Sequence, residues 1–413
     1  MTETLKPQPW MTAEPTRKVM AALHAVGPAR FVGGCVRDAL LGKAVSDIDI
    51  ATPLAPQAVI DALKAAGLRA VPTGIEHGTI TAVADGKPFE ITTLRRDVET
   101  DGRRAVVAFT GDWAEDAARR DFRLNSLYLD EDGAIYDPTG EGVADARAGQ
   151  IVFVGDAGTR IREDYLRILR FFRFFARYGR GEPDVAALNA CAALREGMRG
   201  LSGERVSQEL LKVLAADDPR PALRLMAASG VLGVILPEVQ GLARCEALVG
   251  IEAGQLFTCD PALRLAALLP DDTQAVRVAA TRLRLSNTLR DRLLAAVSGE
   301  PKLTSWMSPR EVRRAVYRLG APAFKDRVML AWAASGGEVA APQWRMLTVY
   351  PDTWTPPAFP ISAEEIKAAG VEPGPMHGKV RREVEDWWID MDFTDDKLAA
   401  IERLKAVAQG MVR

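Results

Sequence analysis

Apolar and polar residues follow two different patterns along the chain, and each pattern predicts a different kind of structure. Near the N-terminus, amphipathic helical stretches at 15–27 and 55–67 are followed by short stretches typical of strands, at 68–72, 78–85 and 88–94. Helices interleaved with a small mixed sheet indicate an α+β head.

From residue 181 to the end of the chain, helical patterns dominate. They are clearest in 202–214, 217–239, 281–294, 308–320 and a C-terminal segment that contains a pair of tryptophans. A proline-rich connector, 353–365, interrupts them. The predicted fold class is therefore α+β, with a small mixed-sheet head followed by an all-helical neck, body and tail.

The stretch 31–52, FVGGCVRDALLGKAVSDIDIAT, contains the most distinctive chemistry of the chain. In a strand, the spacing of Asp47 and Asp49 places both carboxylates on one face. Two adjacent carboxylates repel each other unless a cation lies between them. Hard oxygen ligands of this kind suit Mg²⁺, which takes its remaining ligands from water and from phosphates of a substrate. A solvated turn is the alternative for an isolated Asp-x-Asp.

Upstream of the two aspartates, a glycine pair begins a short helical run. Gly33 and Gly34 allow the backbone to approach a ligand closely. The free N–H groups at the start of the predicted helix, 35–41, could face a triphosphate, and Arg37 adds a planar donor suited to phosphate oxygens. Each part alone is common in unrelated proteins, but the ordered combination is specific.

Gly-Gly-x-x-Arg-Asp, a helix, a connector and a strand with Asp-x-Asp resemble the first motif of the polymerase-β-type nucleotidyltransferases. The similarity is to the branch that holds bacterial tRNA CCA-adding enzymes and poly(A) polymerases. The resemblance implies that Asp47 and Asp49 bind the catalytic metals. It also implies that Gly34 and Arg37 contact the incoming nucleotide.

A third carboxylate is expected on the strand PFEITTL. Phe89 and Ile91 alternate with Glu90, so Glu90 lies on the opposite face of its strand. The resemblance implies a carboxylate on this strand, where it would complete metal coordination or take the proton of an attacking hydroxyl. An exposed strand glutamate without a role is the alternative.

Residues 95–118 are charged and lack long apolar runs, so we expect part of them to form a mobile loop beside the site. The next segment, 118–130, resembles the family's second motif, Arg-Arg-Asp-Phe-Thr-Ile-Asn-Ala. It departs from that motif at Arg123, Leu124 and Ser126. The resemblance implies that Arg120 contacts nucleotide phosphates, and that Asp121 and Asn125 contact ribose hydroxyls, which would favour ribonucleotides. An ordinary charged helix start is the alternative.

The segment 162–179, REDYLRILRFFRFFARYG, predicts a helix with two different sides. Arginines stack along one side, at Arg167, Arg170, Arg173 and Arg177. The buried side carries Leu166, Leu169, Phe172 and Phe175. Glu163 stands four residues before Arg167, in the favourable order for an ion pair that fixes the guanidinium.

A fixed carboxylate beside a fixed guanidinium can select a base without a template. Asp164 can accept from the exocyclic amine of cytosine or adenine, while Arg167 donates to ring or carbonyl acceptors. Uracil and guanine would present a carbonyl to Asp164, which places two acceptors face to face. The segment resembles the family's Glu-Asp-x-x-Arg motif, with Tyr165 where proline is common, and there these residues recognise the base. A solvated arginine-striped helix is the alternative.

Composition restricts the remaining possibilities. The net charge of the 413 residues is −2, so nucleic-acid contact must come from a local basic face. No Cys-x-x-Cys pair and no apolar signal or spanning segment is present, which argues against zinc, a disulfide framework and a membrane, and favours the cytoplasm. The cysteines are Cys35, Cys191, Cys245 and Cys259.

The resemblance implies a template-independent RNA nucleotidyltransferase that uses Mg²⁺. The RNA 3′-hydroxyl would attack the α-phosphate of CTP or ATP, adding C and A residues to the 3′ end of tRNA, with Arg170 and Arg173 as further nucleotide contacts. The expected domains are a catalytic head at 1–150, a neck with the base-recognition helix at 151–235, and an RNA-binding body and tail at 236–413. A poly(A) polymerase and an enzyme that adds only CC or only A remain open. An inactive RNA-binding relic is the alternative from a different class.

Overall fold

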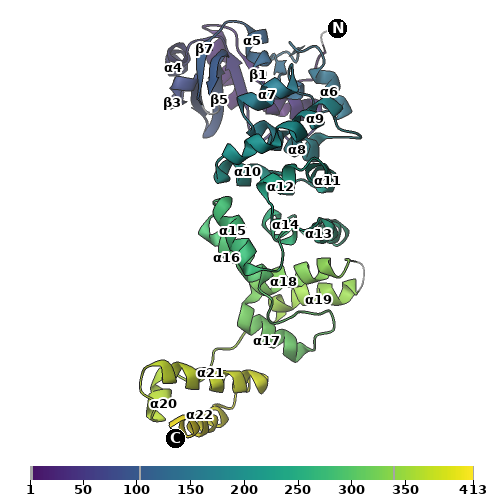
Figure 1. The fold of residues 1–413 in the computed structure, drawn as a ribbon. Coiled ribbons are helices and arrows are strands. Elements are labelled where there is room, and N and C mark those ends of the chain that lie inside the picture. Colours follow the sequence, from purple (N-terminus) through teal and green to yellow (C-terminus); the bar gives the residue numbers. More distant parts are fainter. Residues whose placement is uncertain (1–2, 102–103, 338–339, 413) are drawn as a thin grey trace. The chain divides into compact units, whose positions relative to one another are not determined.

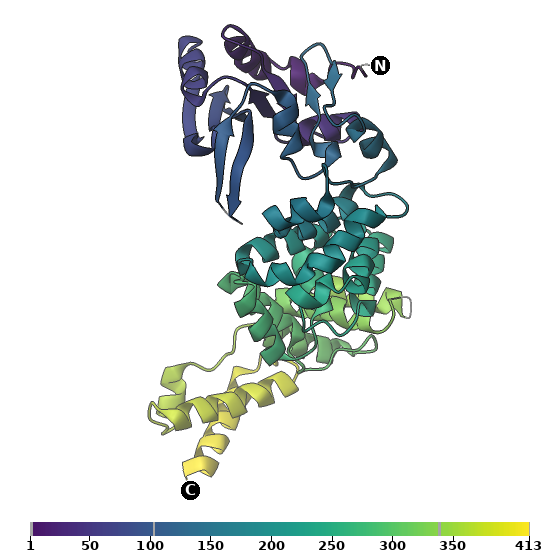
Figure 2. The same cartoon turned by 45° about the horizontal axis from the view of Figure 1, so that its top comes forward.

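The computed structural model describes residues 3–101, 104–337 and 340–412. The chain forms two compact units. The first comprises Met1–Val239 with Arg282–Arg284, and the second comprises Gln240–Thr281 with Leu285–Arg413. Figures 1 and 2 show strands only in the N-terminal, purple to blue part of the chain, whereas the teal to yellow part is helical. This division of secondary structure confirms the predicted α+β class.

The sheet of the first unit has seven strands in the order β3-β4-β5-β2-β1-β8-β9. Neighbours β2 and β5 run parallel, and the other neighbouring pairs are antiparallel, so the sheet is mixed as predicted. The strands are β1 (Arg30–Val32), β2 (Asp49–Thr52), β3 (Arg69–Gly74), β4 (Thr79–Ala84), β5 (Lys87–Thr93), β8 (Tyr128–Leu129) and β9 (Ile135–Tyr136).

One face of this sheet is covered by helices. α2 (Glu14–His24) and α4 (Pro56–Ala65) pack against each other and against β4. Ile50 and Ile91, which are paired across the parallel strands, are fully buried in the core between sheet and helices. Because side chains alternate along a strand, their neighbours Asp49 and Glu90 lie on the other face. The apolar core thereby orients two of the predicted catalytic carboxylates.

Residues 95–118, part of which the sequence predicts to be mobile, contain regular structure. β6 (Arg95–Asp101) and β7 (Arg104–Phe109) pair as a separate antiparallel two-stranded sheet, and α5 (Trp113–Ala118) follows. The sequence did not predict this two-stranded ribbon, and the expectation that part of 95–118 is mobile stays a prediction. A segment without long apolar runs can still form such a ribbon, because backbone pairing between adjacent segments supports it.

The helical part of the first unit begins after the sheet. Its helices are α6 (Gly142–Ala148), α7 (Ala157–Glu163), α8 (Leu166–Tyr178), α9 (Val185–Leu194), α10 (Gly203–Leu214), α11 (Arg220–Ala228) and α12 (Val231–Ile235). The apolar side of α8 packs against α10 and α11. The predicted buried side of this helix is confirmed, since all four of its apolar members are buried.

The second unit consists of helices among its described residues. They are α13 (Ala243–Gly254), α14 (Pro261–Leu268), α15 (Thr273–Arg282), α16 (Asn287–Val297), α17 (Pro309–Leu319), α18 (Ala321–Ala334), α19 (Ala341–Thr353), α20 (Ala363–Ala368), α21 (Pro375–Asp390) and α22 (Lys397–Val412). The last three share a small core of their own. None of the described helices has the length and apolarity that a bilayer crossing requires.

The predicted continuous helix at 281–294 was wrong. α15 ends at Arg282, Arg284 has a φ of +48°, and α16 begins after Ser286. The hydroxyl of Ser286 accepts from the N–H of Leu289 at 3.2 Å, which caps α16. The periodicity of apolar residues continued across the break, but the serine cap was the signal that a new helix begins.

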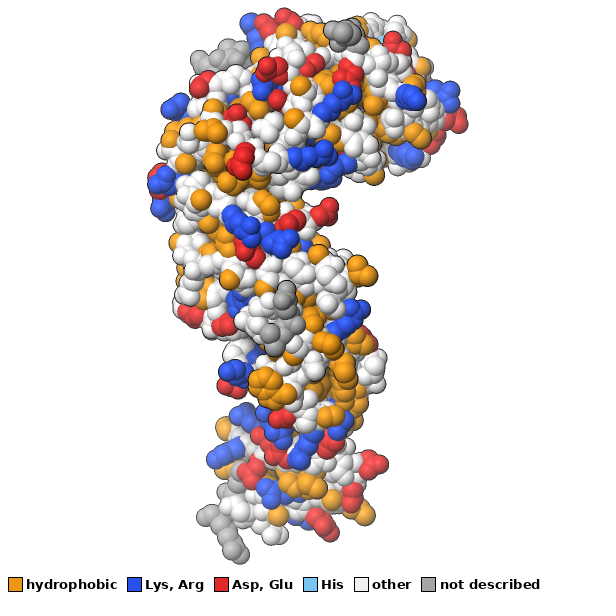
Figure 3. Space-filling model, turned by 90° about the vertical axis from the view of Figure 1, so that its right-hand side faces the viewer, with side chains coloured by type: hydrophobic (Ala, Val, Ile, Leu, Met, Phe, Trp, Pro, Cys, Tyr) orange, Lys and Arg blue, Asp and Glu red, His pale blue; other side chains and the backbone are white. Residues whose placement is uncertain are grey.

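Charged side chains are interspersed on the face of the molecule in Figure 3, where Lys and Arg lie among Asp and Glu. That face has no continuous basic band. This distribution agrees with the net charge of −2. On this face, binding of a polyanion would therefore depend on local groups of cations.

Candidate active site

Asp49 and Glu90 are paired directly across the parallel strands β2 and β5. Asp49 is the first residue of β2, and the exposed Asp47 lies in the segment before the strand. The prediction that both aspartates belong to one strand was therefore wrong for Asp47. Ser46 donates its hydroxyl hydrogen to the Asp47 carboxylate at 2.9 Å. The approach to β2, rather than the strand itself, positions the first aspartate.

The raised pKa of Asp49 reflects its burial and repulsion from the neighbouring carboxylates of Glu90 and Asp47. Burial and the charges of Glu90 and Asp47, opposed by the Arg120 guanidinium, together raise the pKa of Asp49 to about 6. A divalent cation would remove this repulsion by neutralising the carboxylates. The oxygen-only donor set fits Mg²⁺.

The donor set is incomplete without substrate. Among the described residues, no three His, Cys, Asp or Glu side chains are grouped closely enough to enclose a metal ion. Mg²⁺ usually keeps several waters and binds through one or two carboxylates together with substrate phosphates. The arrangement at Asp47 and Asp49 matches that kind of site rather than an all-protein cage.

The glycine turn brings the backbone close to the second motif. Gly33 has a φ of +71° and precedes α3 (Gly34–Leu40). A Cβ atom at Gly33 would lie 3.7 Å from Nη1 of Arg120 and 3.8 Å from the backbone oxygen of Asn125. The left-handed conformation is what requires glycine here, because a side chain would fit in the space but strain the backbone.

A chain of hydrogen bonds connects three of the predicted motifs. Arg37 donates from Nη1 to Oδ1 of Asn125 at 2.5 Å and from Nη2 to the hydroxyl of Tyr178 at 2.6 Å. Asn125 in turn donates to Oδ1 of Asp121 at 3.1 Å, and Arg170 donates from Nε to Oδ2 of Asp121 at 2.7 Å. Residues far apart in sequence are thus joined in one polar network.

Asp121 occupies the centre of that network and is buried. Burial alone would raise its pKa, but the Arg170 guanidinium and the Asn125 amide hold the pKa of Asp121 below its usual range. Both oxygens of its carboxylate therefore have protein partners. In this structure Asp121 orients Arg170 and Asn125, and a ribose hydroxyl would have to share these atoms.

The third motif is interrupted where the sequence predicted a continuous helix. α7 ends at Glu163, Asp164 is extended with a φ of −157°, and α8 begins at Leu166. Glu163 nevertheless forms the predicted ion pair with Arg167 across this break. Arg167 also donates to the backbone oxygen of Arg160 at 2.8 Å. The predicted partners are confirmed, whereas the single helix is not.

Asp164 is held from two directions. Its Oδ1 accepts from the N–H of Leu166, the first residue of α8, at 3.1 Å, and its Oδ2 accepts from Nη2 of Arg205 at 2.6 Å. Arg205 lies on α10, and sequence reasoning did not single it out. The last predicted nucleotide contact, Arg173 of α8, forms an ion pair through Nε with Glu209, which also lies on α10, at 3.2 Å.

The most important residue missed by sequence reasoning is Asp116 of α5. Its carboxylate is 1% exposed and accepts from Arg119 at 2.7 Å, from Arg120 at 2.9 Å and from the Tyr128 hydroxyl at 2.6 Å. Arg119 and Arg120 follow Asp116 by three and four residues, a helical spacing that could have revealed it. Asp116 thereby fixes the guanidinium that acts on Asp49.

Replacing Asp116 by alanine is expected to destabilise the first unit. The change would leave two guanidinium groups without their buried acceptor, which costs about 3–5 kcal/mol. Two cationic neighbours hold the pKa of Asp116 well below its usual range despite its burial. Its stabilising contribution is therefore present above about pH 4, the usual range of an unfolded aspartate, and is lost as the pH falls towards its folded pKa.

Thermal unfolding of the parent and of Asp116→Ala between pH 3 and pH 8 would measure this effect. Tyr128→Phe is the matched control, since it removes one neutral donor and should cost about 1 kcal/mol. Equal unfolding temperatures for the parent and Asp116→Ala at pH 7 would contradict the assignment.

Comparison with known proteins identifies the relatives of this chain. Residues 29–152 match the family model described as poly A polymerase head domain, and residues 183–242 match the one described as probable RNA and SrmB-binding site of polymerase A. The mitochondrial CCA tRNA nucleotidyltransferase 1 of Mus musculus is 34% identical over 388 residues, covering 91% of this chain and 86% of that protein. The CCA-adding enzyme of Levilactobacillus brevis is 30% identical, covering 94% and 96%.

Solved structures with the same fold include two CCA-adding enzymes. That of Bacillus stearothermophilus in complex with CTP has a TM-score of 0.74 and 24% identity, covering 97% of this chain and 100% of that one. That of Thermotoga maritima complexed with tRNA has a TM-score of 0.67 and 20% identity, covering 99% and 100%. At these identities the structural likeness establishes the fold.

Proposed function

Because this chain belongs to the family of tRNA CCA-adding nucleotidyltransferases, we propose that it adds C and A residues from CTP and ATP to the 3′ end of tRNA. The observation that carries the proposal is a hydrogen-bond network that joins three sequence motifs, from Arg37 through Asn125 and Asp121 to Arg170. The Asp49–Glu90 pair and the network of Arg37, Asn125 and Asp121 belong to one folded unit. The reaction is attack of the RNA 3′-hydroxyl on the α-phosphate, with release of pyrophosphate.

We assign Mg²⁺ binding to Asp47 and Asp49. When bound, Mg²⁺ supplies activation of the nucleophile and stabilisation of the leaving group. Glu90 is assigned to the proton of the attacking hydroxyl, because its carboxylate is exposed and lies beside Asp49 across the two strands. Arg120 faces the same carboxylates and would neutralise a phosphate oxygen there.

The incoming nucleotide is proposed to bind between the glycine turn and α8. Gly34 offers a close backbone approach, and Arg37, Arg170 and Arg173 supply guanidinium donors. Asp121 and Asn125 hold these donors in position through hydrogen bonds. A ribose hydroxyl could bind Asp121 or Asn125 only by sharing oxygen and nitrogen atoms that already form these hydrogen bonds. Asp164 and Arg167 are proposed to recognise the base.

The domain division remains a proposal: a catalytic head at 1–150, a neck at 151–235, and a body and tail at 236–413 that bind RNA. An isolated head would be a poor test, because Phe122 packs on Phe153 and Phe174 with ring centroids 4.7 and 5.1 Å apart. A cut near residue 150 would remove both partners. We propose a cytoplasmic location, which the free state of all four cysteines supports.

The experiment uses the full chain and tRNA transcripts that end before, within and after CCA. Each transcript is incubated with CTP, ATP, GTP and UTP in turn, with Mg²⁺ present. We expect C addition to the shortest transcript, A addition only after both C residues, and no further addition to the complete end. Repeated A addition to any RNA would indicate a poly(A) polymerase, and addition of only CC or only A would indicate a partial enzyme. No incorporation would favour an inactive RNA-binding protein.

A further inference from the structure

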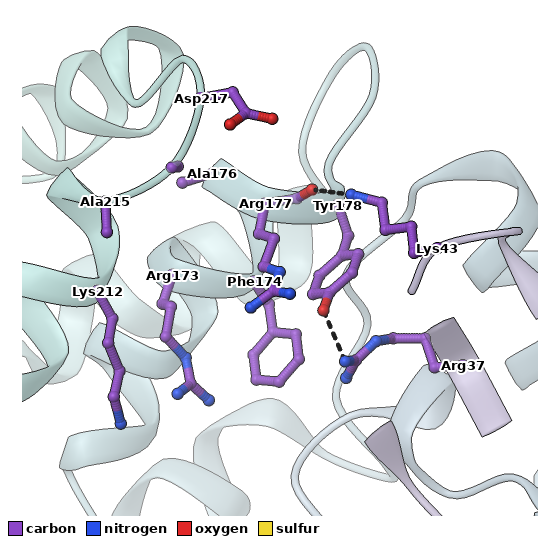
Figure 4. Close-up of a pocket in the computed structure, with 11 residues that line it drawn as sticks. Arg37, Lys43, Arg173, Phe174, Ala176, Arg177, Tyr178, Lys212, Ala215 and Asp217 are labelled. Carbon is purple, nitrogen blue, oxygen red and sulfur yellow. Dashed lines mark hydrogen bonds between the residues drawn. The ribbon is translucent and has the colours of Figure 1, made fainter. Parts of the chain in front are cut away.

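A cavity of about 600 Å³ lies where the C-terminal end of α8 meets α10 and the segment after α3. Figure 4 shows cationic side chains from all three segments directed toward it. The cations that line it are Arg37, Lys43, Arg173, Arg177 and Lys212, and the acid that lines it is Asp217. We refer to it as the α8 cation pocket.

Acidic partners neutralise only part of this charge. Arg37 pairs with Asp38 at 2.9 Å, whereas one carboxylate, that of Glu209, serves both Arg173 at 3.2 Å and Lys212 at 3.4 Å. Burial and the nearby charge of Arg170 lower the pKa of the Arg173 guanidinium, as expected where positive charges accumulate.

The two remaining cations have no acidic partner within the part of the chain that the structure describes. Neither Lys43 nor Arg177 forms an ion pair with any of the described residues. The ammonium of Lys43 donates to the backbone oxygen of Arg177 at 3.3 Å, and both side chains are exposed. The rim of the pocket therefore carries a surplus of positive charge that is accessible to a ligand.

The aromatic rings of the pocket are already covered. Tyr178 has the guanidinium of Arg37 4.1 Å and the ammonium of Lys43 4.9 Å from its ring centroid, and Phe174 has Arg173 at 4.7 Å. A nucleobase would have to displace these cations in order to stack. The chemistry thus favours an anion, and in particular a phosphate group, over a base.

We propose that the α8 cation pocket binds a backbone phosphate of the RNA strand through Lys43, Arg177 and Lys212. The proposal rests on the proposed function, which supplies the RNA. Arg167 and Arg177 are ten residues apart on α8, which corresponds to about 15 Å along the helix axis. Base recognition at one end of α8 is therefore separated from this rim, and the exposed cations suit a strand that crosses the surface.

The test compares RNA affinity with nucleotide use in the full chain. The double variant Arg177→Gln and Lys212→Gln should bind a tRNA transcript lacking CCA roughly tenfold more weakly at low salt, and its slope of log affinity against log salt should be shallower by about 1–2. The KM for CTP and for ATP should stay within twofold of the parent value. Asp217→Asn should have the opposite effect and tighten RNA binding, because it removes the acid from the rim.

Lys64→Gln is the matched control, because it removes an exposed positive charge on α4, outside the pocket. Two results would overturn the proposal. A rise in KM for CTP and ATP with unchanged RNA affinity would mean that the pocket serves the triphosphate, and no change in either quantity would mean that it binds neither. The parent protein is assayed first for nucleotide incorporation, so a failure of the proposed function appears there, independently of the pocket variants.

Discussion

Replacing Asp49 by alanine is expected to abolish nucleotide addition, with a loss of at least roughly a thousandfold in kcat when Mg²⁺ is saturating. Asp49 stands at the start of β2, paired with Glu90 across the parallel strands, and it is one of the two carboxylates that we propose hold the metal. Incorporation of labelled CTP into a tRNA transcript is the measurement. Asp47→Ala should lose activity as well. Full activity of either folded variant with Mg²⁺ present would remove the metal-site proposal.

The loss should occur without unfolding, and the amide variant of Asp49 provides the control. Because the pKa of Asp49 is raised to about 6, ionising this carboxyl opposes folding when no metal is bound. The free energy of unfolding decreases as the pH rises from 3.8, the ordinary pKa of an aspartate, to about 6, and this loss of stability stays constant at higher pH. In chelator-treated protein, Asp49→Asn should therefore have the same free energy of unfolding as the parent below pH 4. It should exceed the parent stability above pH 6 by roughly 1–3 kcal/mol, at about 1.4 kcal/mol per pKa unit.

Local spacing was enough to predict two features of the site. The alternation in β5 placed Glu90 opposite the core, and the four-residue interval between Glu163 and Arg167 predicted their ion pair. Both predictions depend on distances along one short segment, which backbone geometry determines.

Contacts between distant segments could not be predicted in this way. Arg37 and Tyr178 are 141 positions apart, and Asp164 and Arg205 are 41 apart. Which side chains meet across such intervals depends on how helices pack on the sheet, and the periodicity of one segment contains no information about its partner. Asp116 differs, because its helical spacing to Arg119 and Arg120 was visible, but its burial was not.

The break between α7 and α8 is a local feature that the sequence pattern also failed to predict. Arginine periodicity predicted one helix over 162–179, yet Asp164 leaves the helical conformation and its side chain accepts from the N–H of Leu166, the first residue of α8. Aspartate side chains readily accept from nearby backbone N–H groups, which favours turns over helix interiors. The consequence is functional: the carboxylate proposed to recognise the base lies in a turn with fixed backbone geometry, held by Arg205, rather than on an exposed helix face.

Asp164→Asn is therefore expected to change base selectivity more than stability. The asparagine oxygen can still accept from the N–H of Leu166, while the new N–H₂ group can donate to O4 of uracil. Acceptance from the amines of cytosine and adenine loses its charge assistance. Each good bidentate pair contributes about 1–3 kcal/mol of discrimination, so a shift of roughly ten- to a hundredfold towards UTP relative to CTP is expected. Arg167→Ala should lower the use of both CTP and ATP, because it removes a shared donor and leaves Glu163 with Arg160 as its remaining partner.

Asp164→Asn also removes the ion pair with Arg205, and the effect of that loss has to be separated from the effect on base recognition. Arg205→Gln removes the same ion pair but keeps the Asp164 carboxylate, so it should reduce incorporation without a shift towards UTP. The measurement is kcat/KM for each of the four nucleotides on one tRNA transcript, for the parent and the three variants. If Arg205→Gln shifted selectivity as strongly as Asp164→Asn, the position of the carboxylate rather than its hydrogen-bonding character would decide base choice. If Asp164→Asn kept the parent preference at an undiminished rate, the base would be recognised outside this turn.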